Sequence, residues 1–280
     1  MRDLAAQVAA ICGKPVADIA PLSGGSVASV MRVRFADRSS VVAKQGAKLA
    51  LEAWMLEELA RTGCVPVPRV IHAEKSLLLL EYIEAGDAID APAQRHAAEL
   101  LASLHAVTAP TYGLERDTLI GGLDQPNAPS PLWLPFFRDR RLLYMADQAL
   151  QTRGITPALR ARIDKLAARL GEWIDEPPRP SLIHGDMWGG NVLVRRGRIA
   201  GFVDPAIYYA DREIELAFAT LFNTFDRPFF DAYHALKPIA PGFWEARRDI
   251  YNLYPLLVHA RLFGGSYAGA IDRTLTKFGV

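Results

Sequence analysis

Residues 182–205 read LIHGDMWGGNVLVRRGRIAGFVDP and hold the most informative pattern in the chain. Short apolar runs flank Arg196-Gly197, a dipeptide that suits a two-residue hairpin turn. With the turn centred there, we expect Asn191 to lie opposite Phe202. Asp204 follows two residues later, close enough to share a site with Asn191. The stretch therefore predicts a hairpin that brings an amide and a carboxylate together at one end.

Asp186 adds a second carboxylate to this end of the hairpin. It precedes Asn191 by five residues and follows His184 by two, which matches the spacing of the kinase catalytic loop. Phosphoryl transfer needs a carboxylate that orients the attacking hydroxyl, and oxygen ligands that hold Mg²⁺. We predict Asp186 as the catalytic base, Asn191 and Asp204 as magnesium ligands, and His184 as a residue that braces the loop.

Each of these residues alone has a simpler explanation. Asp and Asn are common in turns because their side chains bond to nearby backbone groups. The three residues in this order, with a hairpin between them, favour a phosphoryl-transfer site.

Lys44 provides a separate indication. It follows Val41-Val42-Ala43 in a predicted strand, and the alternation of that strand turns its side chain inward. A buried lysine is costly unless an anion pairs with it. We expect Glu52, early in the next predicted helix, to be that anion in preference to Glu57 or Glu58. Such a pair holds the α- and β-phosphates in kinases.

Two further segments suit a nucleotide. Residues 22–26, LSGGS, join two predicted strands, and glycine lets backbone N–H groups approach phosphates, although no Walker pattern follows. Residues 80–83, LEYI, end a buried strand where a kinase-like chain would bind the adenine edge through its backbone. The predicted nucleotide-binding residues are Gly24, Gly25, Ser26, Lys44, Glu52, Glu81, Tyr82 and Ile83.

The order of predicted elements indicates an α+β fold with two lobes. Residues 1–83 read as a short helix and a strand-rich unit that ends in the hinge, and residues 84–280 as a larger, mainly helical lobe. We expect residues 109–131 to form a long ordered loop. Helical periodicity recurs at 92–107, 132–149, 156–174 and through most of 211–278. Strands and helices do not alternate throughout, which argues against a doubly wound sheet.

Composition limits the partners. The chain has 280 residues and a net charge of +1, which gives no reason to expect a nucleic-acid-binding face. Cys12 and Cys64 form no Cys-x-x-Cys pair and are expected to be reduced. Neither a signal-peptide core nor an apolar run of membrane-spanning length is found. We predict a cytoplasmic protein without membrane or nucleic-acid partners, either a monomer or a homodimer.

The loop at 184–191 resembles that of the fructosamine (ketosamine) kinase family, within the aminoglycoside and choline kinase-like group. In that family Trp-Gly-Gly or Trp-Ser-Gly stands between the Asp and the Asn. Residues 204–213, DPAIYYADRE, are similar to its metal-binding segment. Further matches are LIGG at 119–122, QPN at 125–127, FFRDRRL at 136–142 and LFGGSY at 262–267. The resemblance spans about residues 20 to 270.

This resemblance implies a protein-kinase-like fold and ATP- and Mg²⁺-dependent phosphorylation of a sugar hydroxyl on a small or protein-linked ketoamine. It also implies a role in deglycation or repair. Ser26 stands where some members carry a cysteine, so a redox switch there is not expected. Glu215 stands where the family commonly has Asp before Leu-Ala, and we expect the longer carboxylate still to brace the catalytic loop.

Several side chains have both a functional and a structural interpretation. Trp188 and Tyr209 are candidates to flank the acceptor sugar, or they pack in the core. Arg138 to Arg141 are expected to form a solvated helix face. His234 and His259 lie on helical patterns and are expected to be packing or surface residues.

Other functions stay open at this point. The chain could phosphorylate another small acceptor, such as an aminoglycoside, choline or a sugar. It could also be a nucleotide-binding regulator without catalysis, although such a protein should have lost one of Lys44, Asp186, Asn191 or Asp204. A protein kinase is disfavoured because no Ala-Pro-Glu element follows Asp204.

Overall fold

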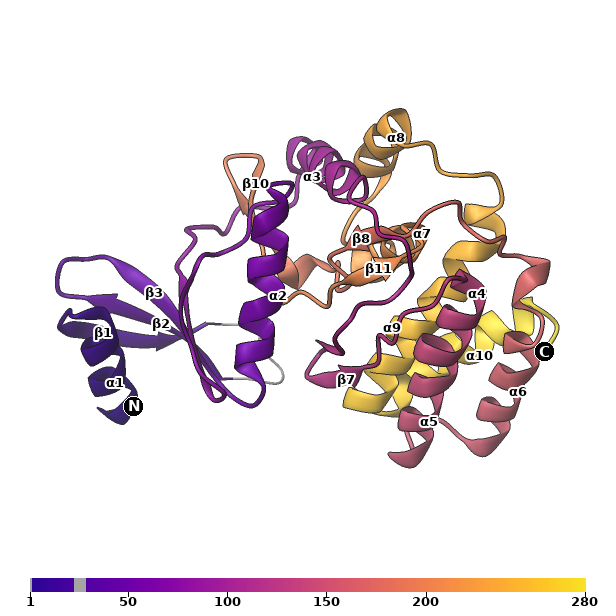
Figure 1. The fold of residues 1–280 in the computed structure, drawn as a ribbon, viewed down its shortest axis with the longest axis horizontal. Helices are drawn as coiled ribbons and strands as arrows, with labels where there is room; N and C mark the ends of the chain where they lie inside the picture. Colours follow the sequence, from indigo (N-terminus) through magenta and orange to yellow (C-terminus); the bar gives the residue numbers. More distant parts are fainter. Residues whose placement is uncertain (1, 23–28) are drawn as a thin grey trace.

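The computed structural model describes residues 2–22 and 29–280, which form a small and a large lobe (Figure 1). The small lobe comprises the elements from α1 to β5. Its antiparallel sheet has the order β1-β2-β3-β5-β4. The elements are α1 (Arg2–Cys12), β1 (Val16–Pro21), β2 (Ser29–Phe35), β3 (Ser40–Gln45), α2 (Leu49–Thr62), β4 (Val70–Ala73) and β5 (Leu77–Glu81).

Helix α2 lies between the sheet and the large lobe (Figure 1). It ends at Gly63, which has a φ of 64° and donates its N–H to Ala60 O. Its apolar side chains divide between two cores. Leu49, Ala53 and Leu56 pack with Leu78 and Leu80 of the sheet, whereas Met55 and Leu59 join the main core of the large lobe. The position of α2 is therefore fixed from both sides.

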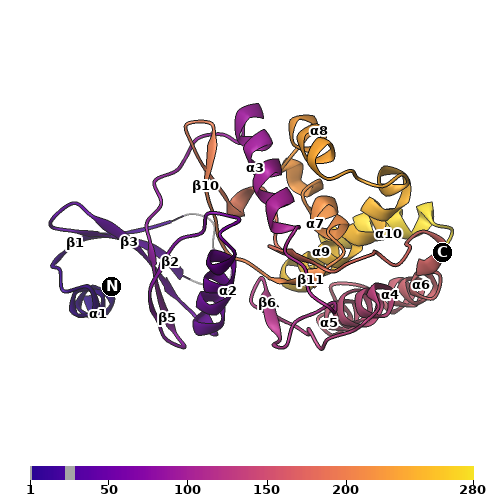
Figure 2. The ribbon, with the colours of Figure 1, turned by 45° about the horizontal axis from the view of Figure 1, so that its top comes forward.

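The large lobe is mainly helical and carries three two-stranded sheets (Figure 2). Its α-helices are α3 (Ala91–Leu104), α4 (Trp133–Phe136), α5 (Tyr144–Gln151), α6 (Pro157–Ala167), α7 (Glu213–Phe218), α8 (Arg227–Leu236), α9 (Arg248–Phe263) and α10 (Ala268–Lys277). Two π-helices are η1 (Phe137–Leu143) and η5 (Phe243–Arg247). Short 3₁₀ turns are η2 (Leu170–Glu172), η3 (Gly189–Asn191), η4 (Leu221–Asn223) and η6 (Gly265–Tyr267).

The three small sheets are hairpins or pairs of distant strands. β6 (Thr118–Ile120) pairs with β7 (Leu123–Gln125), β8 (Ser181–Ile183) with β11 (Tyr208–Ala210), and β9 (Val192–Arg195) with β10 (Arg198–Phe202). All three pairs are antiparallel. These strands lie on the side of the large lobe that is nearer to α2 (Figures 1 and 2).

The predicted α+β arrangement is confirmed, with two local corrections. The predicted loop at 109–131 contains the β6–β7 hairpin, whose three-residue strands are too short to show alternation. The helix predicted at 156–174 ends at Ala167 and continues only as the 3₁₀ turn η2.

Within the described residues, every helix is too short or too polar to cross a lipid bilayer.

Candidate active site

The β9–β10 hairpin has its turn where the sequence predicted it, but its register differs by one residue. Phe202 pairs with Val192 instead of Asn191 because the pairing shifts between Ile199 and Gly201. Ala200 is thus an extra residue, as in a β-bulge. Asn191 still accepts a hydrogen bond from Val203 N, at 3.1 Å, through its backbone oxygen. The two ends of the hairpin therefore remain side by side.

The loop before the hairpin passes very close to the segment after it. Gly185 has a φ of 86°, and a Cβ atom at this position would lie 2.1 Å from Ala206 O. Ala206 N donates to His184 O at 2.8 Å. Only glycine combines this backbone conformation with such an approach. The Gly in His-Gly-Asp is therefore required for the contact that sets Asp186 beside the 204–206 segment.

The side chain of Asn191 orients Asp186. Its Nδ2 donates to Asp186 Oδ2 at 2.9 Å and to Asp186 O at 2.8 Å. Burial raises the pKa of Asp186 to about 7; the bond from Asn191 opposes that rise, and the charges of Asp204 and Glu215 add to it. A carboxylate with a pKa near neutrality suits a general base.

Lys44 of the small lobe forms ion pairs with a carboxylate of each lobe. Its side chain is 7% exposed, and Nζ lies 2.6 Å from Glu52 Oε1. The predicted Lys44–Glu52 pair is therefore present. Lys44 also forms an ion pair with Asp204, which the sequence did not indicate. Burial alone would lower the pKa of Lys44, but the carboxylates of Asp204 and Glu52 outweigh burial and raise it. Lys44 is therefore a buried, paired cation.

Asn191 and Asp204 offer oxygen atoms to one cleft. Because Asn191 uses Nδ2 toward Asp186, its Oδ1 is left as an acceptor. Asp204 has a φ of 54°, a conformation that Asp tolerates better than most residues, and its side chain is 38% exposed. Mg²⁺ is often held by one or two protein oxygens together with phosphates and water. The oxygen atoms of Asn191 and Asp204 fit such an ion. A site made of three or more His, Cys, Asp or Glu ligands does not occur in the described part of the chain.

Glu215 braces the catalytic loop, as its longer carboxylate was expected to do. The side chain is fully buried. Its Oε1 accepts from Gly185 N at 2.6 Å, and its Oε2 accepts from His184 N at 3.2 Å and contacts His105 Nε2 at 2.8 Å. Burial alone would raise the pKa of Glu215, but its hydrogen bonds and the nearby histidines lower it overall. The ionised carboxylate therefore anchors two consecutive backbone amides of the loop.

His184 also braces the loop, as predicted. Its Nε2 lies 3.0 Å from Val203 O, and its Nδ1 accepts from Asp186 N at 3.4 Å. Burial lowers the pKa of His184, which favours the neutral ring that this pattern requires.

The cleft between the lobes has a volume of about 510 Å³, and the buried Glu215 and His184 are not part of its lining. Of the predicted site residues, the lining includes Lys44, Glu52, Asp186, Trp188, Asn191 and Asp204. The ring of Trp188 covers Gly190, where a Cβ atom would come within 2.3 Å of the indole. A side chain at position 190 would clash with this ring, which explains the second glycine of the Trp-Gly-Gly sequence. The close packing on Gly190 also keeps the indole of Trp188 at the cleft.

Tyr209 and residues 81–83 are not among the residues that line this cleft. Tyr209 lines a separate cavity of about 200 Å³ with Trp54 and Ile207, because its neighbour Tyr208 takes the core-facing side of β11. The segment 81–83 is absent from the described lining of the cleft. Glu81 N already donates to Arg69 O at 2.9 Å. The Tyr82 ring lies against the guanidinium of Arg32, and the Ile83 side chain packs near Gly201. Gly24, Gly25 and Ser26 lie outside the described residues.

Sequence reasoning missed the outer part of the cleft. The β6–β7 turn and the end of α9 contribute most of it, with Phe222 from η4. His259 was predicted as a packing or surface residue, yet it lines the cleft. The family matches at 119–122 and 262–267 were the available signal, since both segments reach this wall. The missed residues on this side of the cleft are Leu119, Ile120, Gly121, Gly122, Phe222, Val258, His259, Leu262, Phe263 and Tyr267. The remaining lining residues that were not predicted are Val30, Ala47, Lys48, Leu49, Met55 and Pro205.

Arg141 corrects another prediction, because it is fully buried and does not lie on a solvated face. Its guanidinium lies 3.8 Å from the centroid of the Tyr208 ring. It donates hydrogen bonds to Pro126 O at 2.6 Å and to Asn127 Oδ1 at 2.5 Å. The π-helix η1 alters the helical phase and turns this residue inward. Arg141 thus ties the loop after β7 to strand β11 beside the site.

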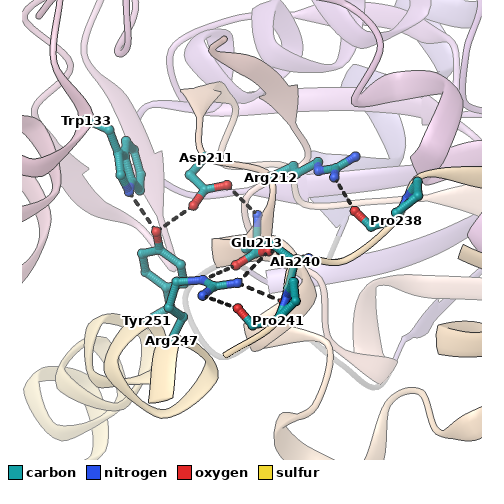
Figure 3. Close-up of polar contacts among 9 residues, drawn as sticks. All are labelled: Trp133, Asp211, Arg212, Glu213, Pro238, Ala240, Pro241, Arg247 and Tyr251. Carbon is teal, nitrogen blue, oxygen red and sulfur yellow. Dashed lines mark hydrogen bonds and ion pairs between the residues drawn. The ribbon is translucent and has the colours of Figure 1, made fainter. Parts of the chain in front are cut away.

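A second buried network anchors the chain after β11 (Figure 3). Tyr251 donates its hydroxyl proton to Asp211 Oδ2 at 2.6 Å and accepts from Trp133 Nε1 at 2.9 Å. Glu213 pairs with Arg247 at 2.6 Å. Burial, followed by the charge of Glu213, raises the pKa of Asp211 to about 6, while hydrogen bonds from Tyr251 and Glu213 N oppose that rise. The network ties the start of α7, and so Glu215, to η5 and α9.

The raised pKa of Asp211 predicts a pH dependence of stability. The native state binds this proton more tightly than the unfolded chain, so ionisation costs stability as pH rises from about 4 to about 6. Asp211→Asn should remove this loss of unfolding free energy, which amounts to about 3 kcal/mol at most over that pH range. Urea unfolding of both proteins between these pH values measures it. A difference between them that does not vary with pH would contradict this origin.

Comparison with known proteins gives the family. The family model for fructosamine kinase matches residues 1–278. A probable ketoamine kinase of Synechocystis sp. is 35% identical over 239 residues, which cover 84% of this chain and 80% of that protein. The crystal structure of a candidate fructosamine-3-kinase from Thermobifida fusca is similar with a TM-score of 0.88 and 30% identity, covering 99% of this chain and 98% of that one.

Aminoglycoside phosphotransferase APH(4)-Ia shares the fold at 17% identity, with a TM-score of 0.69 over 99% of both chains. The kinase-like fold predicted from the sequence is therefore confirmed. From the match over nearly its whole length, we conclude that the chain is a phosphotransferase and belongs to the fructosamine kinase family.

Proposed function

We propose that this protein transfers the γ-phosphoryl group of ATP, with Mg²⁺, to a sugar hydroxyl of a ketoamine. The observation that carries the proposal is the convergence of Lys44, Asp186, Asn191 and Asp204 in one cleft. The acceptor class follows from relatives that are named ketoamine and fructosamine kinases. Cleft chemistry and family thus support the same reaction by separate routes.

Asp186 acts on the acceptor. Its carboxylate, held by Asn191 at 2.9 Å, accepts a hydrogen bond from the sugar hydroxyl and takes its proton as the oxygen bonds to phosphorus. The bond from phosphorus to the bridging oxygen of the nucleotide breaks at the same time, so ADP leaves with that oxygen. The products are the phosphorylated sugar and ADP.

Charge on the transferring group is offset from both lobes. Lys44, fixed by Glu52 at 2.6 Å, would contact the α- and β-phosphates, with residues 24–26 covering them as predicted from the sequence. Asn191 and Asp204 would hold Mg²⁺, which offsets phosphate charge when bound. In that role Asp204 would give up its ion pair with Lys44. Residues 1–83 would form the ATP-binding lobe and 84–280 the substrate lobe, with the hinge at 81–83.

A deglycation role rests on the chemistry of the product. Phosphorylation of the sugar makes the ketoamine adduct unstable, so the amine is released and repaired. We predict that the amine belongs to a small molecule or to a protein. The cytoplasmic location and the monomeric or homodimeric state are also predictions from the sequence.

The test is an acceptor panel with purified protein, ATP and Mg²⁺. We expect ADP release with a fructosamine and a ribulosamine, and none above background with an aminoglycoside, choline or free sugars. Omission of Mg²⁺ should abolish turnover. Turnover of another acceptor alone would retain the kinase chemistry and refute the ketoamine assignment. Nucleotide binding with no turnover of any acceptor would favour the regulator function considered from the sequence.

A further inference from the structure

The mouth of the cleft carries exposed aromatic side chains. Among the described residues, the large hydrophobic side chains with high exposure are Leu132, Phe222, Leu236, Trp244 and Phe263. Two of them, Phe222 at 43% and Phe263 at 51% exposure, line the active-site cleft. Large apolar groups left open to water at the edge of a pocket indicate a surface that a ligand covers.

These rings continue a row that begins at the catalytic loop. The ring centroid of Phe222 lies 6.5 Å from that of Trp188 and 4.8 Å from that of His259. The His259 ring lies 5.6 Å from Phe263 and 5.0 Å from Tyr267. The aromatic row, defined as these five residues, therefore leads from beside Asp186 outward to the rim.

The row carries no formal charge. Burial lowers the pKa of His259 below its usual value and outweighs the opposing effect of the 2.7 Å contact between Nδ1 and Pro255 O, so the ring is neutral at physiological pH. The charged lining residues come from the nucleotide side of the cleft and the catalytic centre: Lys44, Lys48, Glu52, Asp186 and Asp204. A carboxylate or phosphate group placed along the row would therefore lose water without gaining a partner.

The backbone under Phe222 is unusual. Phe222 has a φ of 57° and the next residue, Asn223, a φ of 54°. This left-handed region is uncommon for a bulky residue, and such outliers gather at functional sites. The contact of the Phe222 ring with His259 and Trp188 accompanies this conformation.

We propose that the aromatic row binds the substituent on the amine nitrogen of the acceptor and selects uncharged aryl or alkyl substituents over acidic ones. The inference rests on the proposed function, because it assumes a ketoamine with its hydroxyl at Asp186 and its sugar beside Trp188. The substituent then extends toward Phe222 and Phe263. A protonated amine near these ring faces gains a cation–π contact as well.

The experiment compares three fructosamines that differ only at nitrogen: N-benzyl, N-methyl and N-carboxymethyl. For the wild-type protein we expect kcat/KM to be about tenfold higher for N-benzyl than for N-methyl, and lowest for N-carboxymethyl. Phe222→Ala and Phe263→Ala should bring the benzyl-to-methyl ratio close to one. Leu236→Ala, an exposed apolar residue away from the cleft, should keep the wild-type ratio.

The outcomes separate this inference from the proposed function. An unchanged benzyl-to-methyl ratio in both phenylalanine variants would overturn the inference, as would a preference for N-carboxymethyl. If no fructosamine is turned over, the proposed function fails. Calorimetric titration with the N-benzyl compound then decides the subsite: binding lost in Phe263→Ala supports it, and no binding to the wild type refutes it. Circular dichroism melting of each variant checks that it is folded.

Discussion

Asp186→Asn is expected to lower the rate of phosphoryl transfer by about 10²–10⁴-fold while nucleotide affinity stays nearly unchanged. Asparagine has the size of aspartate, and its amide oxygen can still accept the 2.9 Å bond from Asn191 Nδ2. It cannot take the proton of the attacking hydroxyl. Because the phosphate contact is proposed for Lys44, and the metal contacts for Asn191 and Asp204, removal of this carboxylate should leave them in place.

Two measurements test this expectation. ADP release under steady state gives kcat, and calorimetric titration gives the affinity for ATP with Mg²⁺. Glu172→Gln, at an exposed position that does not line the cleft, serves as a control for loss of one carboxylate. A joint loss of turnover and nucleotide binding in Asp186→Asn would point to misfolding or a role in holding the metal, and would reject the base assignment.

Glu215→Ala is expected to destabilise the protein by about 3–5 kcal/mol. The change leaves His105 and the backbone N–H groups of His184 and Gly185 without their acceptor in a fully buried place. Since these two amides set the approach to Asp186, kcat should fall as well, even at temperatures where the variant is folded. Urea unfolding and steady-state kinetics measure the two effects.

Variants at the same position refine the cause. Glu215→Gln keeps the volume and one acceptor oxygen, so its loss of stability should be smaller than that of the alanine variant. Glu99→Ala, an exposed change on α3, should shift stability by less than about 0.5 kcal/mol. A Glu215→Ala protein with wild-type stability and kcat would show that the carboxylate does not support the loop.

The geometry of the candidate site was predictable in part because its signals are local. The five-residue spacing from Asp186 to Asn191 and the strand alternation at Lys44 are properties of short segments. The pairing of Lys44 with Glu52 followed from the cost of an isolated buried charge. These signals needed only neighbouring elements. The structure brings the predicted residues to one cleft, and the ion pair of Lys44 with Asp204 adds a contact that the signals did not indicate.

The remaining parts depend on contacts between distant segments. Tyr209 lies on the other side of β11 because the core takes Tyr208, and the sequence did not indicate which of the two tyrosines would face inward. Arg141 is buried because a π-helix changes the phase of its helix, which a regular period cannot anticipate. The aromatic row combines η4, α9 and η6, whose meeting is set by tertiary packing.

The extra residue in β10 has a consequence for the geometry of the site. Side chains on a strand alternate between two faces, so a one-residue slip exchanges them. If Ala200 paired with Leu193, the hairpin would take the regular register, with Asn191 opposite Phe202 and Asp204 on the same face as Asn191. The extra residue reverses this parity, so extended backbone alone would turn the two oxygen donors to opposite faces. The left-handed backbone of Asp204, with a φ of 54°, breaks the alternation, and both donors line the cleft.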